Sequence, residues 1–197
     1  MKLFYPQNRG GKIIGSTFLS GALCLALLLF FVPSIYGQSG YQITPSELIL
    51  LTNQERVKYD LNNLSASPLL AEAARAKASD LLKNGYFSHN SPSGKKFSAW
   101  VREANYDYTV VGENLAMGFD SSQAVIQAWM KSPGHRGNIL RPEYRDIGLA
   151  VLKGRLDGQN TYVIVQYFGS SSNLLLSENL LPYHQAFKAL RNYSVYS

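Results

Sequence analysis

The sequence predicts an α+β domain in which several helices flank a small antiparallel sheet. Two early segments, 45–59 and 68–84, carry the start signals of helices, and the second also has the apolar spacing of a helix. Two late segments, "DIGLAVLKG" and "TYVIVQYFG", have the composition of strands and flank the turn sequence "RLDGQN". A hairpin pairs antiparallel, so helices followed by a late hairpin favour the α+β class over an alternating α/β fold.

The two early helices have clear beginnings. Thr44 is a capping residue, Pro45 suits the first helical position, and Glu47 completes a capping box. In the second segment Ser67 caps, and Gly85 is a natural stop. The apolar stripe of this second helix consists of Leu70, Ala73, Ala74, Ala78, Leu81 and Leu82. Its small alanines predict close packing against another element.

The middle of the chain is expected to alternate loops with short elements. "YFSHNSPSGKKF" is rich in Ser, Gly and Pro and predicts a loop, and 97–104 predicts a short helix. The run 108–111 favours a strand that turns at Gly112. A further helix is expected to be capped by Asp120 and to end at Pro133. A short helix is also expected within the tail, at 183–192.

The N-terminus is expected to lie outside the domain, as a hydrophobic helix. Residues 13–32 form an uncharged apolar run that follows Lys2, Arg9 and Lys12. Its length of about twenty residues suits a membrane span. A signal peptide cleaved after Gly37 is the alternative, and we favour the uncleaved anchor. Both alternatives export the rest of the chain to the extracellular side, either single-pass anchored or secreted, because the basic flank stays inside.

Composition limits the class of protein further. The single cysteine, Cys24, lies in the apolar run, so the exported part has no disulfide and depends on its core. Three of the 19 basic residues precede the run and no acidic residue does, which leaves the exported part with a net charge of +3. No basic cluster is interleaved with aromatic residues, and a nucleic-acid partner is therefore not expected.

Three polar residues are expected in loops: His89 in "FSHNSP", Glu113 in "GENLA" and His135 in "SPGHRGN". Two imidazoles and a carboxylate form a ligand set for zinc or another divalent metal. The same three groups could act without metal as a proton-transfer set, or serve only as hydrogen-bonding residues of their loops. The third histidine, His184, is expected to face solvent in the tail.

Six motifs, in order, carry a resemblance to a known family: "LTNQERVKYDL", "LLAEAARAKASDLLKNGYFSHNSPSG", "VGENLAMG", "AWMKSPGHRGNIL", "IGLAVL" and "VQYFG". Over 46–169 the sequence resembles the bacterial branch of the CAP superfamily, the cysteine-rich secretory, antigen 5 and pathogenesis-related proteins (the SCP-like domain). The resemblance implies an α-β-α sandwich with a small antiparallel sheet between helices. It also implies a surface cleft lined by two histidines and two glutamates.

By motif, the resemblance assigns His89, Glu113 and His135 to that cleft. The fourth position departs from the pattern, since Ser132 stands where eukaryotic relatives have a glutamate. A serine cannot serve as a second carboxylate, which weakens the case for hydrolysis and leaves a metal site of His89, Glu113 and His135. Glu113 is the candidate catalytic residue if the protein is an enzyme.

The expected organisation is a flank and anchor at 1–37, a linker at 38–43, the CAP domain at 44–169 and a tail at 170–197. The expected function is an exported, membrane-tethered module that binds a divalent metal and a peptide or cell-envelope ligand. The alternatives are a metal-dependent hydrolase, acting on peptides or the cell wall, and a lipid-binding protein. Partners are thus the membrane, through 13–32, and one of these ligands.

Overall fold

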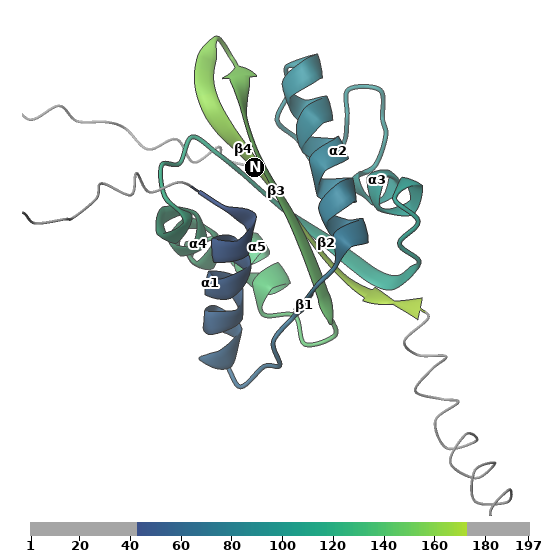
Figure 1. Cartoon of the computed structure of the whole chain (residues 1–197), viewed down its shortest axis with the longest axis vertical. Coiled ribbons are helices and arrows are strands. Elements are labelled where there is room, and N and C mark those ends of the chain that lie inside the picture. The colour runs from purple at the N-terminus through teal and green to yellow at the C-terminus, as the bar shows by residue number, and fades with distance from the viewer. Residues whose placement is uncertain (1–42, 173–197) are drawn as a thin grey trace, which may run out of the picture.

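The structure, a computed structural model, describes residues 43–172. They form three layers, with a four-stranded sheet between two groups of helices (Figure 1). Helices α2 (Pro68–Asn84) and α3 (Phe97–Glu103) cover one face of the sheet. The opposite face is covered by α1 (Pro45–Val57), α4 (Ser122–Lys131) and α5 (Pro133–Ile139). The predicted α-β-α sandwich is therefore confirmed.

The sheet has the strand order β1-β3-β4-β2. Strands β3 (Asp146–Leu156) and β4 (Gln159–Ser171) form the predicted hairpin. The backbone between them has positive φ at Asp157 and Gly158, which matches the twist of a two-residue hairpin turn. Strand β2 (Tyr108–Met117) pairs antiparallel with β4 and forms one edge of the sheet.

The other edge differs from the prediction of a purely antiparallel sheet. Strand β1 (Ser65–Ala66) pairs parallel with β3, so the sheet is mixed. A strand of two residues shows no alternation of apolar and polar side chains. The sequence therefore contains no signal for β1, although it lies directly before the cap of α2.

The predicted starts of α1 and α2 are confirmed, whereas α1 ends at Val57, before the expected Tyr59. The side chains of Thr44 and Ser67 each accept a hydrogen bond from the backbone N–H three residues later. Glu47 was expected to complete a capping box, but its carboxylate accepts from the Ser122 hydroxyl at 2.7 Å and so links α1 to α4. Helix α2 ends at Gly85, which has φ 63°.

Helix α2 packs closely on β3 through its predicted small-residue stripe. A Cβ atom on Gly148 of β3 would lie 2.3 Å from the backbone of Leu70 and Ala71. Glycine at this position therefore allows the helix backbone to approach the strand. The same stripe contains a fully buried lysine, Lys77, which the sequence analysis did not predict.

The expectation that the chain turns at Gly112 is wrong, because β2 continues through this residue to Met117. A Cβ atom on Gly112 would lie 2.1 Å from the Tyr144 hydroxyl oxygen and 3.1 Å from Oδ1 of Asn138. The glycine therefore permits a close contact within a strand and does not mark a turn.

The region around α4 and α5 also differs from the prediction. The cap of α4 is Ser121 and not Asp120, since the Ser121 hydroxyl accepts from the N–H of Ala124. Helix α4 ends at Lys131, but Pro133 begins α5 instead of opening a loop. Proline is favoured at the first helical position because the N–H there needs no helical partner.

Several predictions lie outside the described residues. They concern the span 13–32, Cys24, the tail helix 183–192 and His184. Within 43–172, no helix has both the length and the apolar character that a membrane crossing requires.

Candidate functional site

The three predicted site residues come from three different elements. His89 lies in the loop between α2 and α3, as predicted. Glu113 lies inside β2 and His135 lies in α5, so the expectation that both occupy loops is wrong. Regular elements hold side chains more precisely than loops do. Two of the three groups are therefore fixed by strand and helix backbones.

Alternation along β2 directs its neighbouring side chains Glu113 and Asn114 to opposite faces of the sheet. Glu113 is paired with Tyr167 of β4, whose side chain belongs to the core under α2 and α3. Asn114 contacts residues of α5 on the other face. Because β2 is an edge strand, groups from both faces of the sheet reach its flank.

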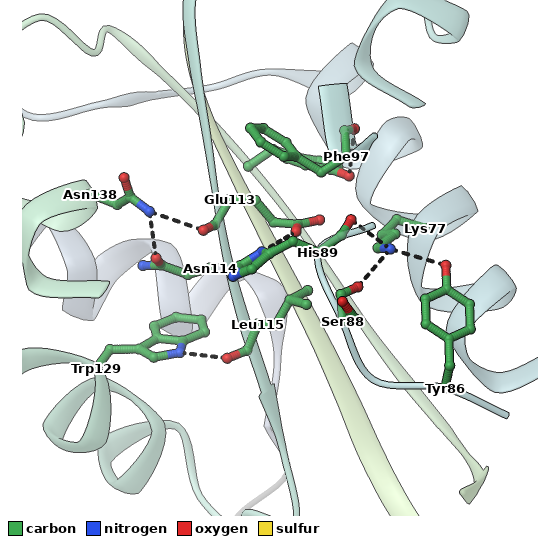
Figure 2. A network of polar contacts seen from close by, with 11 residues as sticks. Lys77, Tyr86, Ser88, His89, Phe97, Glu113, Asn114, Leu115, Trp129 and Asn138 are labelled. Carbon is green, nitrogen blue, oxygen red and sulfur yellow. Dashed lines mark hydrogen bonds and ion pairs between the residues drawn. The ribbon is translucent and has the colours of Figure 1, made fainter. Parts of the chain in front are cut away.

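His89 contacts Glu113 directly (Figure 2). Its Nδ1 atom lies 2.6 Å from Oε1 of Glu113, whose side chain is only 1% exposed. When the carboxylate accepts this bond from a neutral imidazole, the proton is on Nδ1 and Nε2 keeps its lone pair. The second oxygen, Oε2, is buried and has no hydrogen-bond partner within 43–172. The hydroxyl of Tyr167, its cross-strand neighbour, donates to the Phe97 carbonyl at 3.2 Å.

The environment of Glu113 contains opposing electrostatic effects. Burial raises the pKa of its carboxyl group, because a charged carboxylate loses its hydration there. The contact with His89, the positive charge of Lys77 and the neighbouring Tyr167 hydroxyl lower this pKa and oppose the increase. Burial and the charge of Glu113 also raise the pKa of the Tyr167 hydroxyl, which therefore stays protonated.

His135 presents a ring nitrogen without a partner. Its Nε2 atom is buried and makes no hydrogen bond within the described part of the chain. The ring lies near Trp129, with 6.4 Å between ring centroids. Burial lowers the pKa of His135, and His89 lowers it further when its own ring is protonated. The imidazole is therefore held neutral, and the two histidines lie within electrostatic reach of each other.

A buried amide network holds α5 against β2 (Figure 2). The Nδ2 atom of Asn138 donates to the Glu113 carbonyl at 3.0 Å and to Oδ1 of Asn114 at 2.9 Å. The Nδ2 atom of Asn114 donates to the His135 carbonyl at 3.3 Å and to Oε1 of Gln166 at 3.0 Å. The helix that carries His135 is thus bonded to the strand that carries Glu113.

This network extends across the sheet to α1. Nε2 of Gln166 donates to the Thr52 hydroxyl at 2.9 Å, and both side chains are fully buried. The sequence analysis did not predict the residues of this network. The sequence contains one indication of them: Asn138 follows His135 by three residues, a spacing that puts both on one side of a helix.

Two further residues near the site are Ser132, which was predicted to line the cleft, and Lys77, which was not predicted. Ser132, the predicted fourth position, is the half-buried residue between α4 and α5, and its hydroxyl does not cap α5. Lys77, which was missed, donates to the His89 carbonyl at 3.1 Å. The sequence does contain a signal for Lys77. Its spacing from Ala73, Ala74 and Ala78 puts it on the apolar stripe of the helix, where a lysine is unusual.

The family profile of the cysteine-rich secretory proteins (CAP) matches residues 49–168. The chain belongs to the CAP family. The resemblance seen in the sequence is thereby confirmed.

Two curated relatives of this CAP domain come from Bacillus subtilis strain 168. The uncharacterized protein YkwD is 38% identical over 108 residues, which is 54% of this chain and 42% of YkwD. The uncharacterized membrane protein YlbC is 34% identical over 111 residues, which is 56% of this chain and 32% of YlbC. The matched part of this chain thus spans less than half the length of either relative.

Solved structures share the CAP fold. An extracellular protein from Bacillus anthracis that contains an SCP domain is 28% identical, with a TM-score of 0.55 over 64% of this chain and 40% of that one. An outer surface protein of Borrelia burgdorferi is 24% identical, with a TM-score of 0.59 over 64% of this chain and 92% of that one. The second likeness concerns the fold alone.

Whether the site can bind a metal ion depends on which of its nitrogen and oxygen atoms have no other partner. Residues 43–172 contain no group of three or more His, Cys, Asp or Glu side chains that could hold one. One oxygen of Glu113 is bonded to Nδ1 of His89. The donors that remain are Oε2 of Glu113 and the Nε2 atoms of the two histidines. Both Oε2 of Glu113 and Nε2 of His135 are buried and make no hydrogen bond within residues 43–172. A carboxylate bonded to the far ring nitrogen is the arrangement that orients metal-binding histidines.

Proposed function

We propose that this protein is an exported binding module whose CAP domain takes a divalent metal ion at His89 and His135. The observation that carries the proposal is the 2.6 Å contact between His89 Nδ1 and Glu113 Oε1. In a neutral His89 ring, that contact favours the tautomer in which Nε2 keeps its lone pair for a metal ion. Glu113 then orients the ligand His89, and its own role as a ligand is secondary.

The state of His135 supports the same function. A metal ligand must be a neutral imidazole, and a pKa below the ordinary value keeps His135 neutral over a wider range of pH. Its Nε2 is buried, and no group within 43–172 replaces the hydrogen bonds that water would make to it. Binding a cation would take the place of those hydrogen bonds.

The bound ligand is a peptide or a cell-envelope component on the extracellular side of the membrane. The apolar run 13–32 and the basic flank before it support membrane tethering. One relative is called a membrane protein, and one solved relative is called an extracellular protein. A bound metal ion supplies a Lewis acid that polarises an oxygen atom of such a ligand.

A metal-dependent hydrolase is the second candidate. The observation in its favour is the buried carboxyl of Glu113, whose pKa is raised and whose Oε2 has no partner within the described residues. Such a carboxyl can transfer a proton at neutral pH. Metal-dependent turnover of peptides or peptidoglycan fragments that disappears in Glu113→Gln would favour this candidate over a binding module.

Zinc titration calorimetry on the full chain, without a histidine tag, tests the proposal. The wild type is expected to bind one zinc ion, and the double variant His89→Ala/His135→Ala is expected to bind none. His184→Ala removes the third histidine of the chain and is the matched control, with binding unchanged. Retention of zinc by the folded double variant would overturn the proposed site.

A further inference from the structure

Lys77 is a charged side chain inside the core. It lies on α2 with 0% of its surface exposed, among the alanines that pack on the sheet. Its Nζ atom lies 4.2 Å from the centre of the Trp100 ring and 4.8 Å from that of Tyr86. A buried ammonium group is costly unless its protons are bonded, so its contacts indicate what it does.

Each of the three ammonium protons has an acceptor. Nζ donates to the Ser88 carbonyl at 2.9 Å, to the His89 carbonyl at 3.1 Å and to the Tyr86 hydroxyl oxygen at 3.1 Å. The Tyr86 hydroxyl uses its own proton in a short bond to Asp80. Its oxygen therefore accepts from Lys77, and three acceptors require the charged form of the lysine.

Two of these three acceptors belong to the backbone that carries His89 (Figure 2). The Ser88 and His89 carbonyls lie on either side of the His89 Cα atom. Otherwise the His89 segment is irregular, and its ring is held by the contact with Glu113 and by an edge-on approach to Phe97 at 6.5 Å. A segment without helix or strand bonds depends on such anchors for a fixed position.

We propose that Lys77 is a positioning residue of the site, which fixes the backbone of His89 so that Nδ1 meets the Glu113 carboxylate. Asp80 and Tyr86 support it, because their bond leaves the Tyr86 oxygen available to Lys77. The inference rests on the proposed function only for the effect on metal affinity. The effect on the His89 ring is independent of any ligand.

Lys77→Met is the direct test, because methionine keeps most of the apolar stem and removes the three donors. The readout is the tautomer of the His89 ring, from nitrogen NMR at alkaline pH, where the signals no longer change with pH. The His89 signals are assigned by their absence in His89→Ala. The wild type is expected to show the proton on Nδ1, and Lys77→Met is expected to revert to the mixed tautomers of a free imidazole.

Zinc calorimetry on the same variant gives the second readout. Loss of a residue that orients a metal ligand typically reduces affinity by about 10–100-fold, and Lys77→Met is expected to fall in that range. Lys83→Met, an exposed lysine of the same helix, is the matched control and should change neither readout. If the wild type binds no zinc, the proposed function fails while the tautomer still decides the role of Lys77.

Tyr86→Phe covers the case in which Lys77→Met does not fold. It keeps the ring and removes one of the three acceptors, so a partial loss of the Nδ1 tautomer is expected. A folded Lys77→Met with the wild-type tautomer would overturn the inference. If that variant is unfolded, a wild-type tautomer in Tyr86→Phe would overturn it.

Discussion

The Nδ1 atom of His89 lies 2.6 Å from Oε1 of Glu113, although 24 residues separate them in the chain. One comes from an irregular loop and the other from the edge strand β2. The carboxylate is buried, whereas the imidazole side chain is 35% exposed. The pair therefore has a buried carboxylate at one end and a partly exposed imidazole at the other.

Glu113→Gln should keep the fold and weaken zinc binding by about 10–100-fold. The amide has the shape of the carboxyl group but lacks the charge that favours the Nδ1–H tautomer of His89. Calorimetry with zinc measures the change. Glu72→Gln, at an exposed position of α2, is the control and should bind like the wild type. Equal affinities for all three proteins would show that Glu113 does not act on the metal site.

Asn138→Leu should destabilise the domain by about 1–3 kcal/mol, because the Glu113 carbonyl and Oδ1 of Asn114 each lose a buried donor. Zinc affinity should fall as well, since α5 carries His135. Chemical denaturation measures the free energy of unfolding. Gln127→Leu, at an exposed position of α4, should leave the zinc affinity unchanged. A stable Asn138→Leu variant with full affinity would contradict the anchoring role of the network.

Gly112→Ala should destabilise the domain by about 1–3 kcal/mol or more, the usual cost of overpacking. The added Cβ would lie 2.1 Å from the Tyr144 hydroxyl oxygen, and Tyr144 is fully buried with little room to move. Gly137→Ala in α5 is the contrasting variant, since a Cβ there meets nothing within 4 Å. It should leave stability unchanged or raise it, because alanine favours the helix. Similar losses in both variants would contradict the close contact at Gly112.

His135 should make stability depend on pH in metal-free buffer. Its folded pKa lies below the ordinary value of 6.5, so the unfolded chain takes up the proton first as the pH falls. The contribution of His135 to stability is therefore complete above pH 6.5 and is lost between that value and the folded pKa. Denaturation of the wild type and of His135→Gln across this range measures it. The stability difference between the two proteins should shrink as the pH falls, and a constant difference would contradict a buried neutral His135.

Local signals in the sequence predicted the helices and the hairpin. The expected caps are present, with Thr44 and Ser67 at the starts of α1 and α2 and Gly85 at the end of α2. Such caps can be predicted because they act over only three or four residues. The turn predicted at Gly112 was wrong. A glycine is needed there because the Tyr144 side chain lies close to it, and not because the backbone turns. Pro133 follows the end of α4 and is also the first residue of α5. The sequence predicted that a helix ends near Pro133 but not that another begins there.

The site was predicted less completely than the fold. His89, Glu113 and His135 were named as candidates, but no local pattern indicated that His89 and Glu113 share a hydrogen bond. The supporting residues were missed because their contacts are remote, as with Gln166 and Thr52, which are 114 residues apart. Such pairs exist only once the sheet and helices are assembled.

In the proposed site, His89 and His135 bind one metal ion together, each through Nε2. Anomalous diffraction at the zinc absorption edge, from crystals of the protein soaked in zinc, tests this directly. We expect a single strong peak about 2.0–2.1 Å from Nε2 of His89 and from Nε2 of His135. A zinc peak bound elsewhere, or no peak at these two nitrogens at saturating zinc, would contradict it.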